Sequence, residues 1–185
     1  MKKKVLWQDC LYEDNINGIN FDSIMDFSYR WKNECPGRIV SNVGGWQSPC
    51  YFHSGKKCNE LDKVISIIQK KIKHFNKRFG KILDLDCLWI NINPTGSFNK
   101  VHDHLSGPIF SGVLYIHAKK GMGNIVFIKT SNILNMSEDD RNIYSSEHFP
   151  STGKMFIFPA DLLHYVKENE DVEDRVSISF NLSYC

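Results

Sequence analysis

The chain contains 185 residues, the size of one domain whose core is large enough to fold without disulfide or metal support. Hydrophobic residues make up 42% and charged residues 24% of the sequence, proportions that argue against a disordered chain and against a membrane protein. The net charge of +2 is too small to indicate nucleic-acid binding. Any ligand or substrate must therefore be inferred from a site.

The first ten residues, MKKKVLWQDC, are basic but carry too few apolar side chains for the core of a signal peptide. We therefore expect a cytoplasmic protein, in which the six cysteines, forming no CxxC pair, remain free thiols. The abundance of Lys, Asn and Ile suggests an AT-rich coding sequence, such as that of a virus or a small-genome marine bacterium.

Two helices are expected in the first half of the chain. A weak apolar pattern predicts one from about Asp22 to Trp31. Apolar residues at three- and four-residue steps predict a stronger one from Leu61 to Phe79, with Asn59 placed to cap its start and Gly80 to end it. The segment between the two helices, which includes SNVGGWQSPCYF, is expected to be irregular.

After Gly80 the apolar period changes to two, which is typical of strands. The predicted strands are Cys87–Asn93, Ser111–His117, Asn124–Lys129, Lys154–Phe158, Leu163–Lys167 and Arg175–Ser183. We therefore expect a single domain over residues 1–185, with a helical support and N-terminal extension in 1–80 and a β core in 81–185. The long polar connection 130–153 is a candidate lid over a site, or a surface loop without a role.

Two of these strands combine an apolar face with a polar face, because successive side chains of a strand point in opposite directions. The polar faces carry Trp89, Asn91 and Asn93 on the first strand, and Arg175, Ser177, Ser179, Asn181 and Ser183 on the last. Such a face lies either in solvent or along a wet cavity inside a barrel or double-sheet roll.

Among the seven histidines, His102 and His104 have a spacing that lets them share a metal, since residues i and i+2 of an extended segment project to the same side. His164, on a distant predicted strand, supplies a third candidate. Three such ligands would leave three positions of an octahedral iron open for a cosubstrate and oxygen. Imidazole also binds zinc, and histidines without any metal remain the alternative.

Arg175 and Ser177 stand two residues apart on the polar face of the last predicted strand. If that face points inward, a guanidinium and a hydroxyl could together bind one carboxylate. The alternative is a surface arginine.

Four motifs in order resemble a known family: WININPTGSFNKVHDHLSGPIFSGVLYI, GNIVFI, GKMFIFPADLLHYV and RVSISFN. They resemble the 2-oxoglutarate- and Fe(II)-dependent oxygenases of marine bacteria and their phages, relatives of the prolyl-hydroxylase-like group. The similarity spans Trp89 to Asn181, and SNVGGWQS near Ser41 also resembles a segment of these proteins.

The resemblance implies a mostly β fold with N-terminal helices, a double-stranded β-helix of the jelly-roll or cupin-like barrel type. It implies Fe(II) held by His102, His104 and His164, with 2-oxoglutarate held by Arg175 and Ser177. It also implies that 2-oxoglutarate and O2 are consumed to hydroxylate a primary substrate, a peptide side chain or a small molecule, with release of succinate and CO2.

Some roles stay open within the resemblance. The wider oxygenase superfamily carries a carboxylate two residues after the first histidine, where this chain has His104, so Asp103 is the alternative ligand or an outer partner of an imidazole. Asn91, Asn93 and Tyr115 are candidate pocket residues, or else a strand-end pair of asparagines and a buried core tyrosine.

Two other functions remain open from the sequence. One is a cupin-like iron dioxygenase that uses no 2-oxoglutarate, for which three histidine ligands are familiar. The other is a β-roll module that binds a ligand without catalysis and without a metal. Neither membrane binding nor nucleic-acid binding is expected.

Overall fold

The computed structural model describes residues 10–79, 82–129 and 145–185. Its two helices are α1 (Phe21–Glu34) and α2 (Asn59–Phe79), and a 3-10 turn, η1 (Tyr51–His53), lies between them. Both helices lie where the apolar periodicity predicts them. Asn20 caps α1, since its side-chain oxygen accepts a hydrogen bond of 3.1 Å from the backbone N–H of Ser23.

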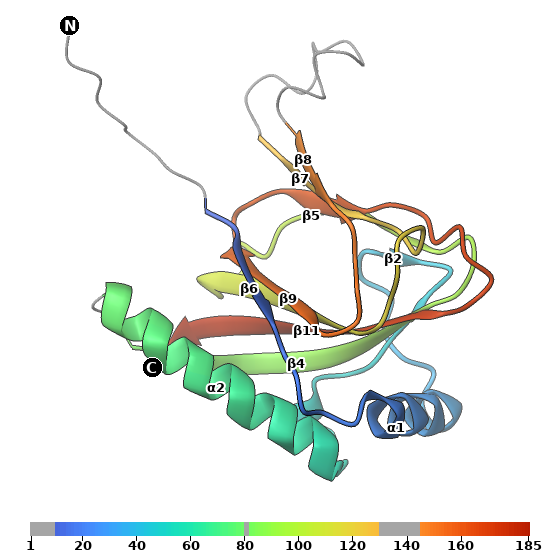
Figure 1. Ribbon diagram of the computed structural model, residues 1–185, viewed down its shortest axis with the longest axis horizontal. Helices are drawn as coiled ribbons and strands as arrows, with labels where there is room; N and C mark the ends of the chain where they lie inside the picture. The colour runs from blue at the N-terminus through green and yellow to red at the C-terminus, as the bar shows by residue number, and fades with distance from the viewer. Residues whose placement is uncertain (1–9, 80–81, 130–144) are drawn as a thin grey trace, which may run out of the picture.

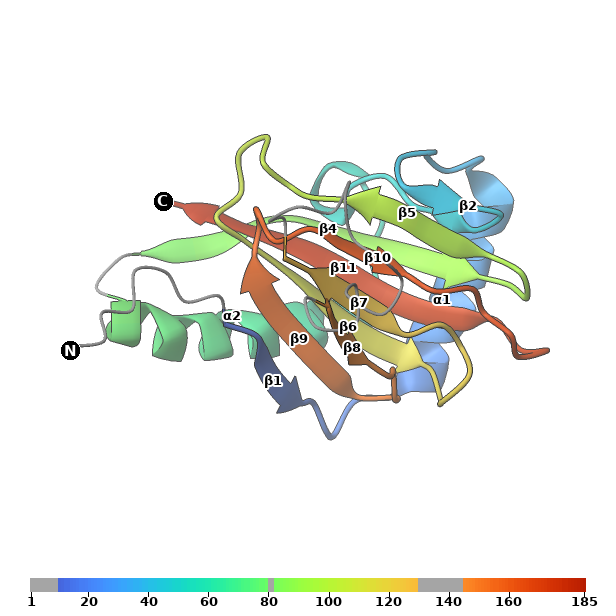
Figure 2. The same ribbon diagram turned by 90° about the horizontal axis from the view of Figure 1, so that it is seen from above.

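The strands form two antiparallel sheets (Figures 1 and 2). The larger has the order β1-β9-β6-β11-β4-β3, with bounds Tyr12–Asn15, Lys154–Pro159, Phe110–His117, Arg175–Tyr184, Leu83–Asn93 and Trp46–Gln47. The smaller has the order β2-β5-β10-β7-β8, with bounds Asn42–Val43, Phe98–His102, His164–Val166, Ile125–Ile128 and Ser145–His148. Each β4 residue from Cys87 to Asn93 has a partner on β11, and Arg175 lies opposite Asn93.

The main hydrophobic core lies between the larger sheet and the helices, which cover its outer face (Figure 1). The predicted apolar face of β4 is fully buried there, together with the apolar stripe of α2. The residues of this contact are Leu88, Ile90 and Ile92 of β4 and Leu61, Val64, Ile68 and Ile72 of α2. Burial of these side chains fixes the larger sheet as a rigid base.

The opposite face of the larger sheet turns toward the smaller sheet across a cavity. Arg175 and Ser177 of β11 and Asn91 and Asn93 of β4 are buried along it, although they are polar. The structure therefore decides between the two interpretations of the polar strand faces: at these positions they line a cavity and not solvent.

Some sequence predictions require correction. Hydrogen bonds do not join the two sheets into a closed barrel; the described strands form two separate sheets. SNVGGWQS is not irregular throughout, because Asn42–Val43 pairs with β5 and Trp46–Gln47 pairs with β4. The pattern also missed β1, β5 and β8.

The candidate lid, 130–153, falls largely on residues 130–144, outside the described residues. Its described part contains strand β8, which pairs with β7. Among the described helices, none is both long and apolar enough to span a membrane.

Candidate metal centre

Three histidines meet at the end of the cavity between the sheets. His102 ends β5, His104 lies two residues beyond that end, and His164 begins β10. Strand pairing brings the distant one close, because His164 lies directly opposite His102 in the register of β10 and β5. One ligand atom from each imidazole lies within 4.8 Å of the others, a grouping that could hold one metal ion.

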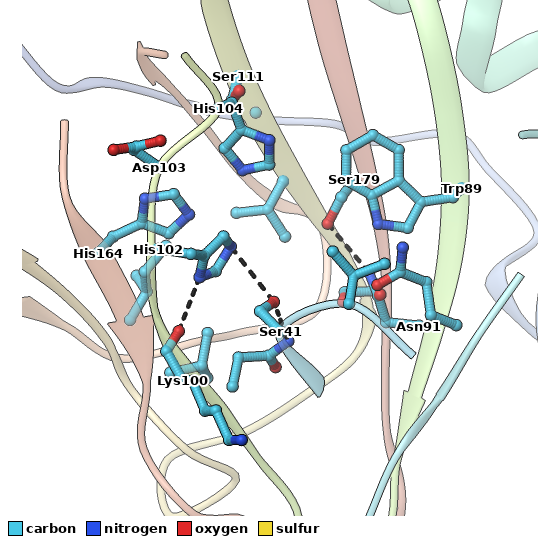
Figure 3. Close-up of a pocket in the computed structure, with 18 of the residues that line it drawn as sticks. Ser41, Trp89, Asn91, Lys100, His102, Asp103, His104, Ser111, His164 and Ser179 are labelled. Carbon is cyan, nitrogen blue, oxygen red and sulfur yellow. Dashed lines mark hydrogen bonds between the residues drawn. The ribbon is translucent and has the colours of Figure 1, made fainter. Parts of the chain in front are cut away.

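Backbone carbonyls orient two of the rings. Nδ1 of His102 donates to the Lys100 carbonyl at 2.7 Å, and Nδ1 of His164 donates to the Leu162 carbonyl at 2.8 Å. Because a carbonyl only accepts, both rings carry their proton on Nδ1 and present the lone pair of Nε2. Figure 3 shows the His102 contact, together with Ser41, whose hydroxyl lies 3.4 Å from Nε2 of His102. The sequence analysis did not identify Ser41 as a partner of the His102 ring.

The three imidazoles are held neutral by burial. Burial lowers the pKa of His102, and burial together with the neighbouring His102 lowers the pKa of His104 to about 4 and that of His164 to about 3. A metal binds only the neutral form, so the site is ready for a divalent cation at neutral pH without first losing protons.

Asp103 does not join this group of ligand atoms. Its carboxylate accepts a hydrogen bond of 3.3 Å from the backbone N–H of Leu105. In Figure 3 this carboxylate points away from the His102 ring. The shared side of His102 and His104 expected from their spacing is thus present, with ring centroids 5.2 Å apart.

The cavity continues from the histidines to a buried arginine and has a volume of about 370 Å³. Arg175 is 2% exposed, and its Nη1 donates to the carbonyls of Met122 and Gly123, both at 2.9 Å. Its Nε has no hydrogen-bond partner among the described residues, and no carboxylate there pairs with it. A guanidinium stays charged when buried, so the edge that carries the unpaired Nε could bind an anion.

Other candidate residues surround this arginine. Tyr115 and Ser177 are paired across β6 and β11, and both line the cavity with Asn91 and Asn93. Burial raises the pKa of Tyr115 to about 12, so its hydroxyl stays protonated and can donate. The side-chain oxygen of Asn93 is buried without a partner among the described residues. The cavity thus ends in polar groups that a ligand could satisfy.

The cavity has a second wall, on which the sequence analysis assigned only Asn91 to a site. It carries Trp89 and Gln47, and Asn91 here donates to the hydroxyl of Ser179 at 3.0 Å (Figure 3). The indole of Trp89 lies 6.1 Å from the His104 ring, measured between centroids. The alternation on β4 placed Trp89 beside Asn91, and that signal would have sufficed to include it.

Residues 87–181, just over half of the chain, match the sequence model of a family described as "Putative 2OG-Fe(II) oxygenase". The chain belongs to this family. Fe(II) and 2-oxoglutarate are therefore its cofactor and cosubstrate, and the neutral triad and unpaired arginine suit a cation and a dicarboxylate. The comparison with curated proteins found no matching sequence.

Solved structures of low sequence identity share the fold. A prolyl-4-hydroxylase of Pseudomonas putida is 12% identical, with a TM-score of 0.66 over 95% of this chain and 92% of its own. The alpha-ketoglutarate-dependent epimerase SnoN from nogalamycin biosynthesis is 11% identical, with a TM-score of 0.73 over 95% and 78%. A viral collagen prolyl hydroxylase from Paramecium bursaria Chlorella virus-1, in complex with 2OG, is 14% identical, with a TM-score of 0.61 over 93% and 94%.

Proposed function

We propose that this oxygenase hydroxylates its primary substrate while converting 2-oxoglutarate to succinate and CO2. The observation that carries the proposal is one cavity with a cation site at one end and a buried, unpaired guanidinium at the other. A metal without 2-oxoglutarate would leave that guanidinium unpaired, and a binding module without a metal would leave the three converging imidazoles without a cation. Family membership and this arginine together favour the oxygenase over both alternatives.

In this proposal His102, His104 and His164 hold Fe(II) and leave its remaining positions to the cosubstrate and oxygen. Three neutral imidazoles leave both charges of the ion for 2-oxoglutarate to balance, whereas a carboxylate ligand would neutralise one of them. The Lys100 and Leu162 carbonyls fix two of the rings, as outer partners of metal-binding histidines commonly do.

The far carboxylate of 2-oxoglutarate is assigned to the free edge of Arg175, whose two parallel N–H groups match a carboxylate. Ser177 and Tyr115 add hydroxyl donors beside it. Asn93 completes this end of the cavity, and Asn91 lies one step nearer the metal along β4. We propose that residues 1–185 form the single domain that performs this reaction.

The bound iron and 2-oxoglutarate supply the oxidative chemistry, and the protein supplies placement and exclusion of water. Apolar side chains enclose the cavity between the two ends, among them Val113, Ile125 and Phe158. Nη1 of Arg175 donates to two backbone carbonyls, so the guanidinium is already oriented when the carboxylate of 2-oxoglutarate binds.

The proposal is tested with protein purified without oxygen. Titration of the Fe(II) form with 2-oxoglutarate should produce the metal-to-ligand absorption of the chelated cosubstrate, and admission of oxygen should then yield succinate. Absence of that absorption at saturating 2-oxoglutarate would exclude the proposed function.

The second metal ligand is tested by two neighbouring variants. We expect His104→Ala to lose the metal. Asp103→Ala removes a group outside the triad and should retain the metal, with an affinity reduced by about tenfold to a hundredfold. Both affinities are measured by anaerobic Fe(II) titration. The opposite ranking would assign the ligand to Asp103.

Gly123 tests how the arginine is placed. It has φ +82°, and a Cβ there would lie against the Lys167 carbonyl oxygen and 2.7 Å from Nη1 of Arg175. We expect Gly123→Ala to displace the guanidinium and to weaken 2-oxoglutarate binding by at least about tenfold. Gly121→Ala is the matched control, because φ is +98° there and its Cβ would meet nothing within 4 Å. Equal affinities in the two variants would contradict this placement.

A further inference from the structure

The mouth of the cavity carries an apolar rim. Val40 and Val101 line the cavity and are nevertheless 61% and 54% exposed. The N–H of Lys100 donates to the Ser41 carbonyl at 2.9 Å, which continues the pairing of Asn42 with Asn99 and brings the two valines opposite each other.

Two further exposed apolar side chains adjoin these cavity residues along the chain. Ile39 precedes Val40 and is 91% exposed, and Leu105 follows the metal-site residue His104 and is 67% exposed. We call Ile39, Val40, Val101 and Leu105 the apolar rim. They are four of the nine large hydrophobic side chains that are exposed in the described part of the chain. Single exposed apolar residues are ordinary, but a group beside a site indicates a binding surface.

The size of the interior beyond the rim and the polarity of its wall beside Trp89 favour a small, uncharged group. A cavity of about 370 Å³ lies at the lower end of the range for ligand sites, and the metal and 2-oxoglutarate occupy part of it. The wall left for the substrate carries Gln47, Trp89, Asn91 and Ser179, all uncharged. The charged lining residues are Lys100, Asp103 and Arg175, the last of which is assigned to the cosubstrate.

We propose that the primary substrate is a polypeptide segment. An uncharged side chain of that segment enters beside Trp89, and apolar side chains next to it contact the apolar rim. This inference rests on the proposed function. A small polar metabolite would leave the rim in water, and a sugar polymer or nucleic acid offers no apolar side chains to cover it. A polypeptide supplies apolar side chains at the rim and backbone amides for the Gln47 and Asn91 side chains.

Two sets of fluorescein-labelled nonapeptides test the proposal. In one set an uncharged central residue, varied from peptide to peptide, is flanked on each side by leucine and valine; in the matched set the flanking residues are serines. Binding is measured by fluorescence anisotropy to the anaerobic Fe(II)–2-oxoglutarate form, and turnover by a 16 Da mass increase after oxygen is admitted. We expect members of the apolar set to bind at least tenfold more tightly than their serine counterparts, and at least one of them to gain oxygen.

Charged variants of the rim supply the second comparison. Val40→Asp and Leu105→Asp should each weaken binding of the apolar peptides by at least tenfold. Ile82→Asp is the matched control, since it places the same charge on another exposed apolar residue, one that directly precedes β4 and lies roughly 23 Å along the chain direction from Trp89. This variant should bind like the unaltered protein.

Three outcomes would overturn the polypeptide assignment: equal binding of the two peptide sets, equal effects of the rim and control variants, or acceleration of succinate formation by a neutral sugar such as maltose but by neither peptide set. The metal-to-ligand absorption of the unaltered protein is recorded first. If it forms and the peptides fail, the substrate inference alone fails; if it does not form, the proposed function fails.

Discussion

Replacing His164 with alanine should leave a folded protein that no longer retains iron. His164 is buried at the start of β10 and comes from a strand far in sequence from the other two proposed ligands, so its loss leaves two imidazoles from one short segment. Two neutral ligands do not complete the facial set that holds iron with open positions. The measurement is metal content after anaerobic reconstitution with Fe(II) and desalting.

His148→Ala is the matched control. His148 also contacts the ring of Phe127, with centroids 5.8 Å apart against 6.1 Å for His164, but it does not line the cavity. We expect this variant to keep its iron. If both variants unfold at similar temperatures and His164→Ala keeps its full iron content, His164 is not a metal ligand.

Truncation of Arg175 to alanine should keep the metal and abolish tight binding of 2-oxoglutarate. Removing one partner of a buried, charge-assisted pair costs about 2–5 kcal/mol, which corresponds to about a 30- to 5,000-fold rise in the dissociation constant. Arg175→Lys should recover only part of the loss, because an ammonium lacks the two parallel donors of the fork.

The affinity for 2-oxoglutarate is measured anaerobically from the metal-to-ligand absorption. Arg30→Ala, which removes an exposed arginine of α1, serves as the control for loss of one positive charge. Arg175→Ala with the affinity of this control would refute the cosubstrate assignment. Iron content is measured in parallel, because loss of the metal would produce the same absence of absorption.

Much of the fold follows from local patterns. The 3.6-residue period of α2 and the two-residue period of β4 and β11 each come from the backbone geometry of one segment and the burial of one of its faces, so they can be seen without knowing the partner. The order of the motifs likewise pointed to the family that the comparison identified. Five short strands escaped, namely β1, β2, β3, β5 and β8, because their pairing depends on neighbours that are distant in sequence.

The sequence by itself determined that His102 and His104 could act together and that β11 has a polar face headed by Arg175. Only the tertiary structure decided that His164 lies opposite His102 and that the polar face meets a cavity. It alone brought Ser41 to the His102 ring and placed Val40 and Val101 along the cavity while leaving both exposed. The reason is physical. The alternation of side chains along a strand predicts which residues share a face, but whether that face lines a cavity or solvent depends on the packing of strands that are far apart in the chain.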